Sequence, residues 1–263
     1  MSAPPAPLRC FQHCRKDTDL VCLRLPERCP LCAAQTALTP CRIPPYVLPS
    51  PFLASTAAPR AVVVRPTDGT FLSHYSSVCD LHIGLTDGAG RVTEFDQRGL
   101  TVGSLWPQCL VVLTCPASAQ CNQPPSGAQC DQPPSGAQCD QPPSGAQLER
   151  PEIVRPGDWD SALDQLRQHG ELWDSRRYAE LTWNCFDLVL HFLSQLTRQR
   201  RLLGLDLHFD LDPPLGSGGA RAELCERFLV QKCRRAGEYV ELYRRVLAEG
   251  CVCVARRKHQ LAA

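Results

Sequence analysis

Short runs of apolar and β-branched residues mark the first half of the chain. Such runs between turn residues are typical of β-strands. The second and third runs flank Asp-Gly-Ala-Gly at 87–90, which predicts a β-hairpin. The four runs cover residues 61–64, 81–85, 91–95 and 109–113.

Helical periodicity replaces these runs in the second half. Asp158 precedes apolar residues at positions i, i+4 and i+7, and Gly170 follows them, which predicts a helix capped by Asp158. Asn184 is a good N-cap for a second helix, over Cys185–Gln199. The same reasoning predicts a loop over 204–219, a helix from near Arg221, a longer helix stopped by Gly250, and a closing strand over 251–254.

Changes in composition divide the chain into four segments. Prolines are frequent at 42–60 and favour extended connecting chain. Residues 119–145 hold three copies of Ala-Gln-Cys-Asn/Asp-Gln-Pro-Pro-Ser-Gly, which lacks the apolar bulk to offset the entropy of ordering. We therefore predict a ribbon-like Cys/His segment at 1–47, the strand-rich half of an α+β domain at 48–118, a disordered repeat insert at 119–147, and the helical half of that domain at 148–263.

Charge and apolar content exclude several functional classes. Lys plus Arg is 28 against 27 for Asp plus Glu, which argues against a nucleic-acid partner. No apolar stretch approaches the roughly 20 residues of a membrane span. The first residues lack the apolar core of a secretory signal, so we expect a cytoplasmic or nuclear protein that is not secreted. Its 17 cysteines are then mostly reduced, and serve as metal ligands, nucleophiles or packing residues.

The N-terminal cysteines predict a zinc site. Cys29-Pro-Leu-Cys32 has the spacing of one zinc knuckle, and a second ligand pair upstream would complete a tetrahedral ribbon. Zinc would also account for order in a segment too short to bury much surface. The residues alone leave four candidates for the upstream pair: Cys10, His13, Cys14 and Cys22.

A histidine on a predicted strand and a cysteine at a predicted helix start form a candidate catalytic pair. The positive end of a helix and a nearby imidazolium both favour a thiolate over a thiol. Cys185 is the first residue of its helix, and His82 would supply the imidazolium if its strand packs beside that helix. Glu94, on the returning strand of the hairpin, would orient His82. A one-residue slip of the hairpin would turn Glu94 to the other face.

These residues resemble the circularly permuted papain-like group, which includes lecithin–retinol acyltransferase-like proteins and NlpC/P60 peptidases. The resemblance rests on residues 82–85, on Gly-Arg-Val at 90–92 with Glu94, and on Asn-Cys at 184–185. It implies an antiparallel sheet with a core helix, in which Cys185 is the nucleophile, His82 the base and Glu94 the orienting residue. The chain departs from the pattern at Glu94, where histidine is usual, and after the cysteine, where Phe-Asp replaces Glu-His.

A second resemblance covers most of the chain and is to the makorin-two opposite-strand protein family. It implies His13 and Cys14 as the partners of Cys29 and Cys32, but the family's activity is essentially uncharacterised. The nonapeptide repeat is extra relative to the family pattern. The matching motifs lie at 11–14, 29–32, 65–72, 80–84, 184–185 and 241–244.

Two functions from different classes follow. One is a non-catalytic interaction module, with the ribbon as its contact surface for an unidentified protein partner. In that case Cys185 is a small buried hydrophobe and His82 a hydrogen-bonded core histidine. The other is a cysteine-dependent hydrolase or acyltransferase with a Cys185–His82–Glu94 triad. The oligomeric state and the substrate are left open by the residues.

Overall fold

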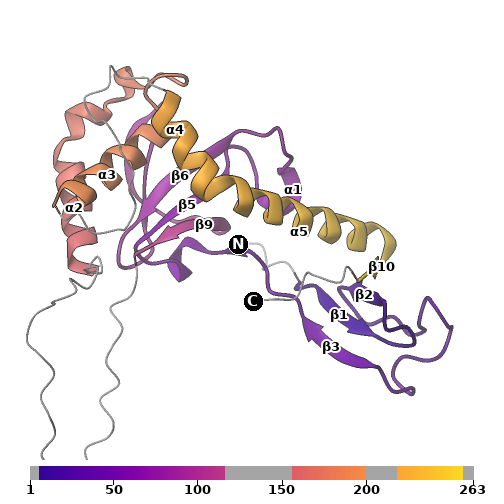
Figure 1. Ribbon diagram of the computed structural model, residues 1–263. Coiled ribbons are helices and arrows are strands. Elements are labelled where there is room, and N and C mark those ends of the chain that lie inside the picture. Colours follow the sequence, from indigo (N-terminus) through magenta and orange to yellow (C-terminus); the bar gives the residue numbers. More distant parts are fainter. Residues whose placement is uncertain (1–5, 116–155, 200–217, 257–263) are drawn as a thin grey trace, which may run out of the picture.

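The computed structural model describes residues 6–115, 156–199 and 218–256. Within these ranges the protein has two antiparallel sheets and a small number of helices, which confirms the predicted α+β class (Figure 1). The nonapeptide repeat and most of the predicted loop over 204–219 lie outside the described residues.

The larger sheet contains the four strands predicted from apolar runs. Its strand order is β4-β9-β5-β6-β7-β8, and all neighbours are antiparallel. The two edge strands were not predicted: β4 has only two residues within the predicted connecting chain, and the glycines of β8 interrupt its apolar run. The strands are β4 (Phe52–Leu53), β5 (Ala61–Pro66), β6 (Leu81–Thr86), β7 (Val92–Asp96), β8 (Gly99–Ser104) and β9 (Cys109–Thr114).

Helices α2 (Pro156–Gln168) and α3 (Cys185–Gln199) pack with this sheet to form the main core (Figure 1). Alternate residues of a strand point to opposite faces, so Ile83, Leu85 and Phe95 reach this core together. A separate apolar cluster contains Val63, Val92 and Trp106. Three short turns of 3-10 helix and a short helix complete this part: η1 (Ser55–Ala57), α1 (Phe71–His74), η2 (Gly170–Trp173) and η3 (Ser175–Arg177).

The smaller sheet joins residues from both halves of the chain. Its order is β10-β2-β1-β3, and β10 (Cys251–Ala255) pairs antiparallel with β2 (Thr18–Cys22). The other two strands are β1 (Arg9–Gln12) and β3 (Ile43–Val47). Two prolines, which predicted connecting chain, instead lie in β3. An edge strand accommodates them because it has one side that needs no N–H donors.

A long helix connects the two sheets. Helix α4 (Gly218–Leu224) leads through a π-helical turn, η4 (Cys225–Leu229), into α5 (Val230–Glu249). Ala236 and Val240 of α5 belong to the main core, whereas Tyr243 and Val246 pack under the small sheet. Figure 1 shows α5 running from the large sheet to β10. Gly250 ends the helix with a φ of 77°, a conformation that favours glycine.

None of the helices in the described ranges combines the length and the apolar character that crossing a membrane requires.

Candidate functional site

The hairpin of β6 and β7 brings His82 and Glu94 together. Thr86 pairs with Val92 across the two strands, and side chains alternate along each strand, so His82 and Glu94 share one face. The Nε2 atom of His82 lies 2.9 Å from Oε2 of Glu94. Both residues are buried, with 7% and 3% of their surface exposed. The register that the sequence left open therefore allows the pairing.

Two further residues surround the Glu94 carboxylate. Trp106 donates its indole N–H to Oε1 at 3.4 Å, and the Arg65 guanidinium lies 3.7 Å from Oε2 and stacks over the Trp106 ring. Burial by itself would raise the pKa of Glu94, but hydrogen bonds from His82 and Ser104 outweigh it and lower the pKa to about 2. Glu94 is therefore a carboxylate at neutral pH.

Close packing around Gly84, two residues after His82, explains why this position holds a glycine. A Cβ atom at this position would lie 2.7 Å from a methyl carbon of Val92 and 3.2 Å from the Trp106 ring. Real Cβ atoms do not approach other atoms as closely as 2.7 Å, so a larger residue would force the Val92 side chain to shift and would also crowd Trp106. Glycine therefore permits the close packing of Trp106 against the hairpin, 5.7 Å from the His82 ring.

Cys185 meets His82 at the start of α3. The cysteine is 5% exposed and is hydrogen-bonded to His82. Burial lowers the pKa of His82, but the hydrogen bonds with Cys185 and Glu94 outweigh it and raise the pKa to about 9. The imidazole is therefore protonated at neutral pH, next to the thiol.

A capping box fixes the first turn of α3. The Phe186 N–H donates to Oδ1 of Asn184 at 2.9 Å, and the Asn184 N–H donates to Oδ2 of Asp187 at 2.7 Å. Arg221 of α4 donates its Nε–H to the other oxygen of Asp187 at 3.2 Å. Asp187, which departs from the permuted papain-like pattern, thus helps to hold the turn that carries Cys185.

Removing the cap is expected to destabilise the protein modestly. Asn184→Ala leaves the Phe186 N–H without its acceptor, and loss of an N-cap costs about 1 kcal/mol. Urea unfolding should show a lower midpoint with an unchanged m-value. Asn184→Asp, which keeps an acceptor oxygen, is the matched control. An Asn184→Ala midpoint equal to that of the unmodified chain would contradict this role for the cap.

Cys185 and His82 open onto a cleft of about 530 Å³. Both acidic and basic side chains line this cleft. The lining includes Arg65, Asp80, Asp96, Arg98, Tyr178 and Glu180.

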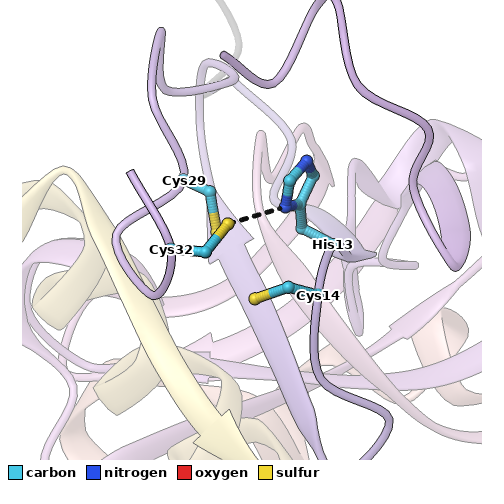
Figure 2. Close-up of side chains that lie close together, drawn as sticks. All are labelled: His13, Cys14, Cys29 and Cys32. Atoms are coloured by element: carbon cyan, nitrogen blue, oxygen red, sulfur yellow. Dashed lines mark hydrogen bonds between the residues drawn. The ribbon is translucent and has the colours of Figure 1, made fainter. Parts of the chain in front are cut away.

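A second cluster lies beside the small sheet. One nitrogen or sulfur atom from each of His13, Cys14, Cys29 and Cys32 falls within 4.8 Å of the others. Figure 2 shows the four side chains converging from two loops, with His13 Nδ1 at 3.3 Å from Cys32 Sγ. The cluster could hold a metal ion. One histidine and three cysteines are a usual ligand set for structural zinc.

Local backbone geometry shapes each half of this cluster. The Leu31 N–H points at the Cys29 sulfur at 3.4 Å, and the Ala33 N–H donates to the Cys29 carbonyl at 2.8 Å, as expected of a tight knuckle. The Nε2 atom of His13 lies 2.6 Å from the Thr39 hydroxyl, which leaves Nδ1 facing the sulfurs. Of the four upstream candidates, the structure places His13 and Cys14 here, whereas Cys10 and Cys22 lie on strands β1 and β2.

Four neighbouring residues with roles at these sites were not predicted: Arg65, Trp106, Asp187 and Thr39. The capping-box spacing of Asn184 and Asp187 was a readable signal. The other three reach their sites only through tertiary contacts, and no local pattern marks them.

These features define an α+β protein with two antiparallel sheets and a cysteine–histidine cluster near its N-terminal end. The chain belongs to the DUF4796 family: the model of the C-terminal part matches residues 45–123 and 146–246, and that of the N-terminal part matches residues 6–35. It is similar to the MKRN2 opposite strand protein of Homo sapiens, with 23% identity over 247 residues that cover 91% of this chain and 86% of that protein. The predicted resemblance to the makorin-two opposite-strand protein family is confirmed. No solved structure matches the chain significantly.

Proposed function

We propose that this protein is a cysteine-dependent hydrolase or acyltransferase of permuted papain-like type. The observation that carries the proposal is that His82 forms hydrogen bonds with both Cys185 and Glu94. His82 and Cys185 also line an open cleft. A thiol, a base and an orienting carboxylate in this relation are the parts of a catalytic triad.

The arrangement of elements supports the papain-like assignment. The nucleophile begins a core helix, and the histidine lies on a strand of the antiparallel sheet against which that helix packs. The histidine strand precedes the cysteine helix in the chain, which is the permuted order. The first backbone N–H groups of α3 add the positive end of the helix dipole beside the sulfur.

The residues can perform acyl transfer in two steps. The Cys185 thiolate attacks the acyl carbonyl, and the His82 imidazolium gives its proton to the leaving group as the carbon–leaving-group bond breaks. Neutral His82 then takes a proton from the acyl acceptor, which is water or another nucleophile. The deprotonated acceptor attacks the thioester and releases Cys185 as a thiolate. Glu94 holds the ring throughout and stabilises its charged form.

His82→Ala is expected to slow alkylation of Cys185 by iodoacetamide about ten-fold at neutral pH. An ordinary thiol, with a pKa of about 8.5, is only about 3% thiolate there, whereas a thiol paired with imidazolium is far more ionised. The lower nucleophilicity of a stabilised thiolate reduces the gain. The rate at Cys185 would be measured against pH by peptide mass mapping.

The exposed Cys253 is the internal reference, because it lies in the small sheet and its rate should be equal in both proteins. A Cys185 rate that rises with pH like an ordinary thiol and is unchanged by His82→Ala would sink the catalytic proposal.

We also propose that the Cys/His cluster binds structural zinc, through His13, Cys14, Cys29 and Cys32. The convergence of the four ligand atoms supports this. Bound zinc would order the loops beside the small sheet, where Leu38 is 77% exposed. Such a surface suits the second candidate function, a non-catalytic interaction module. If His82→Ala folds normally and leaves the alkylation rate of Cys185 unchanged, that result would favour the interaction module over catalysis.

A further inference from the structure

A pair of cysteines outside both sites occupies facing positions in the small sheet. Cys22, the last residue of β2, is directly opposite Cys251, the first residue of β10. The ladder continues from this pair to Ala255 and Thr18, so the two strands are held in one register. The two thiols are hydrogen-bonded to each other.

The spacing of facing residues suits a disulfide. In antiparallel strands the Cα atoms of opposed residues are about 4.5 or 5.5 Å apart, depending on the type of pair. Disulfides span Cα distances of about 4.4–6.8 Å, so either type of pair falls within the range. The backbone spacing of this pair is therefore compatible with a disulfide.

Burial assigns different roles to the two sulfurs. Cys22 has no exposed surface and packs with Phe11 and Leu20, whereas Cys251 is partly exposed. A small reagent in solution can therefore reach Cys251 first. Cys22 is then positioned to react with the product from inside the sheet.

We propose that Cys22 and Cys251 are a redox modification site, which forms a cross-strand disulfide by exchange with a small disulfide such as oxidised glutathione. The hydrogen bond with Cys22 raises the pKa of Cys251, so Cys251 must first give up its proton to solvent. Its sulfur then attacks one glutathione sulfur, which makes a mixed disulfide and releases one glutathione thiolate. The Cys22 thiolate then attacks the Cys251 sulfur and displaces the second glutathione. Two protein thiols are oxidised, one glutathione disulfide is reduced, and the two protons that the protein thiols lose pass through solvent to the two glutathione thiolates.

The bond would link β10 covalently to β2. Because β10 follows α5 directly, and α5 packs against both apolar cores, the link would restrain the helix that connects the two sheets. Cys22 and Cys251 also pack in the same cluster as Cys29, one of the candidate zinc ligands. The site stands independently of the proposed hydrolase, since it shares no residue with the triad.

The test equilibrates the whole chain, in the presence of zinc, in glutathione buffers of graded reduced-to-oxidised ratio. Remaining thiols are then alkylated and the disulfide-linked peptides are mapped by mass. We expect a linked pair containing Cys22 and Cys251 that appears reversibly as the buffer becomes more oxidising. The thermal midpoint of the oxidised form should rise by about 5–10 °C, because a cross-link between residues far apart in the chain restricts the unfolded state.

Cys253→Ser is the matched control, because Cys253 lies on the same strand but faces Leu20 instead of a cysteine. It should keep the linked peptide and the stabilisation, whereas Cys22→Ser should lose both and retain a stable mixed disulfide on Cys251. Far-UV circular dichroism of the reduced variants checks that each is folded. Cys22 and Cys251 that remain free thiols at every ratio, or that pair with other cysteines instead, would overturn the proposal.

Discussion

Cys29→Ser is expected to abolish tight zinc binding and to lower the thermal midpoint of the chain. The four ligand atoms already converge, so the folded protein should bind one zinc ion, and binding to the folded state alone stabilises it. With free zinc at about 1,000 times the Kd, the stabilisation is about 4 kcal/mol. For a domain of this size that corresponds to a shift in Tm of roughly 8–16 °C. Metal content after desalting and the Tm with and without a chelator are the measurements.

Cys41→Ser is the matched control for this experiment. Cys41 lies in the same N-terminal segment as Cys29 and packs against the apolar cluster that contains Cys29. It is not among the four converging residues. It should retain one zinc ion and a chelator-sensitive Tm. Purified protein without zinc, with a Tm that neither added zinc nor a chelator changes, would contradict the zinc proposal.

The free energy of unfolding is expected to be highest between pH 4.5 and 6.5, and to fall on both sides. Glu94 has a lowered pKa of about 2 against an ordinary 4.5, so its contribution is present above pH 4.5 and is lost as pH falls towards 2. His82 has a raised pKa of about 9 against 6.5, so its contribution is complete below pH 6.5 and is lost as pH rises through 9. Both shifts describe one buried pair and correspond to about 3 kcal/mol, counted once.

Glu94→Gln tests the pairing directly. Glutamine keeps the size of the side chain but carries no charge. The free energy of unfolding should therefore fall less steeply as pH decreases below 4.5. The alkaline side should weaken only in part, because Cys185 also stabilises the protonated imidazole. Urea unfolding at a series of pH values measures the curve. Glu171→Gln, at an exposed side chain, should leave it unchanged. Curves for Glu94→Gln and the unmodified chain that coincide would rule out the pair as a source of stability.

Several elements of this fold could be predicted because their signals are local. The strands β5, β6, β7 and β9 each carry an apolar run, and hairpin turns and helix caps use residue types with specific backbone preferences. The start of α3 at Cys185 was predicted to the residue, because Asn184 is a strong cap. Strands β8 and β3 were missed, since glycine and proline mask a strand at the edge of a sheet.

The candidate sites depended on contacts between distant residues. The type and position of His82, Glu94 and Cys185 suggested a triad, but a slip of one residue in the hairpin would have separated the first two. The register of β6 with β7 decided that they meet. Trp106 and Arg65 complete the surroundings of Glu94, and they lie on other segments that only the folded sheet brings near.

The sequence by itself determined the α+β class, the family, the cysteine at the helix start and the Cys-Pro-Leu-Cys half of the cluster. These follow from short-range periodicity, capping and spacing, which neighbouring residues specify on their own. Only the tertiary structure decided that His82 meets Glu94 and that β10 pairs with β2. It also brought His13 and Cys14 to Cys29 and Cys32, a choice that the family resemblance implied but that the residues alone left open. The physical reason is that strand register and packing depend on the whole apolar core, which assembles from segments far apart in the chain.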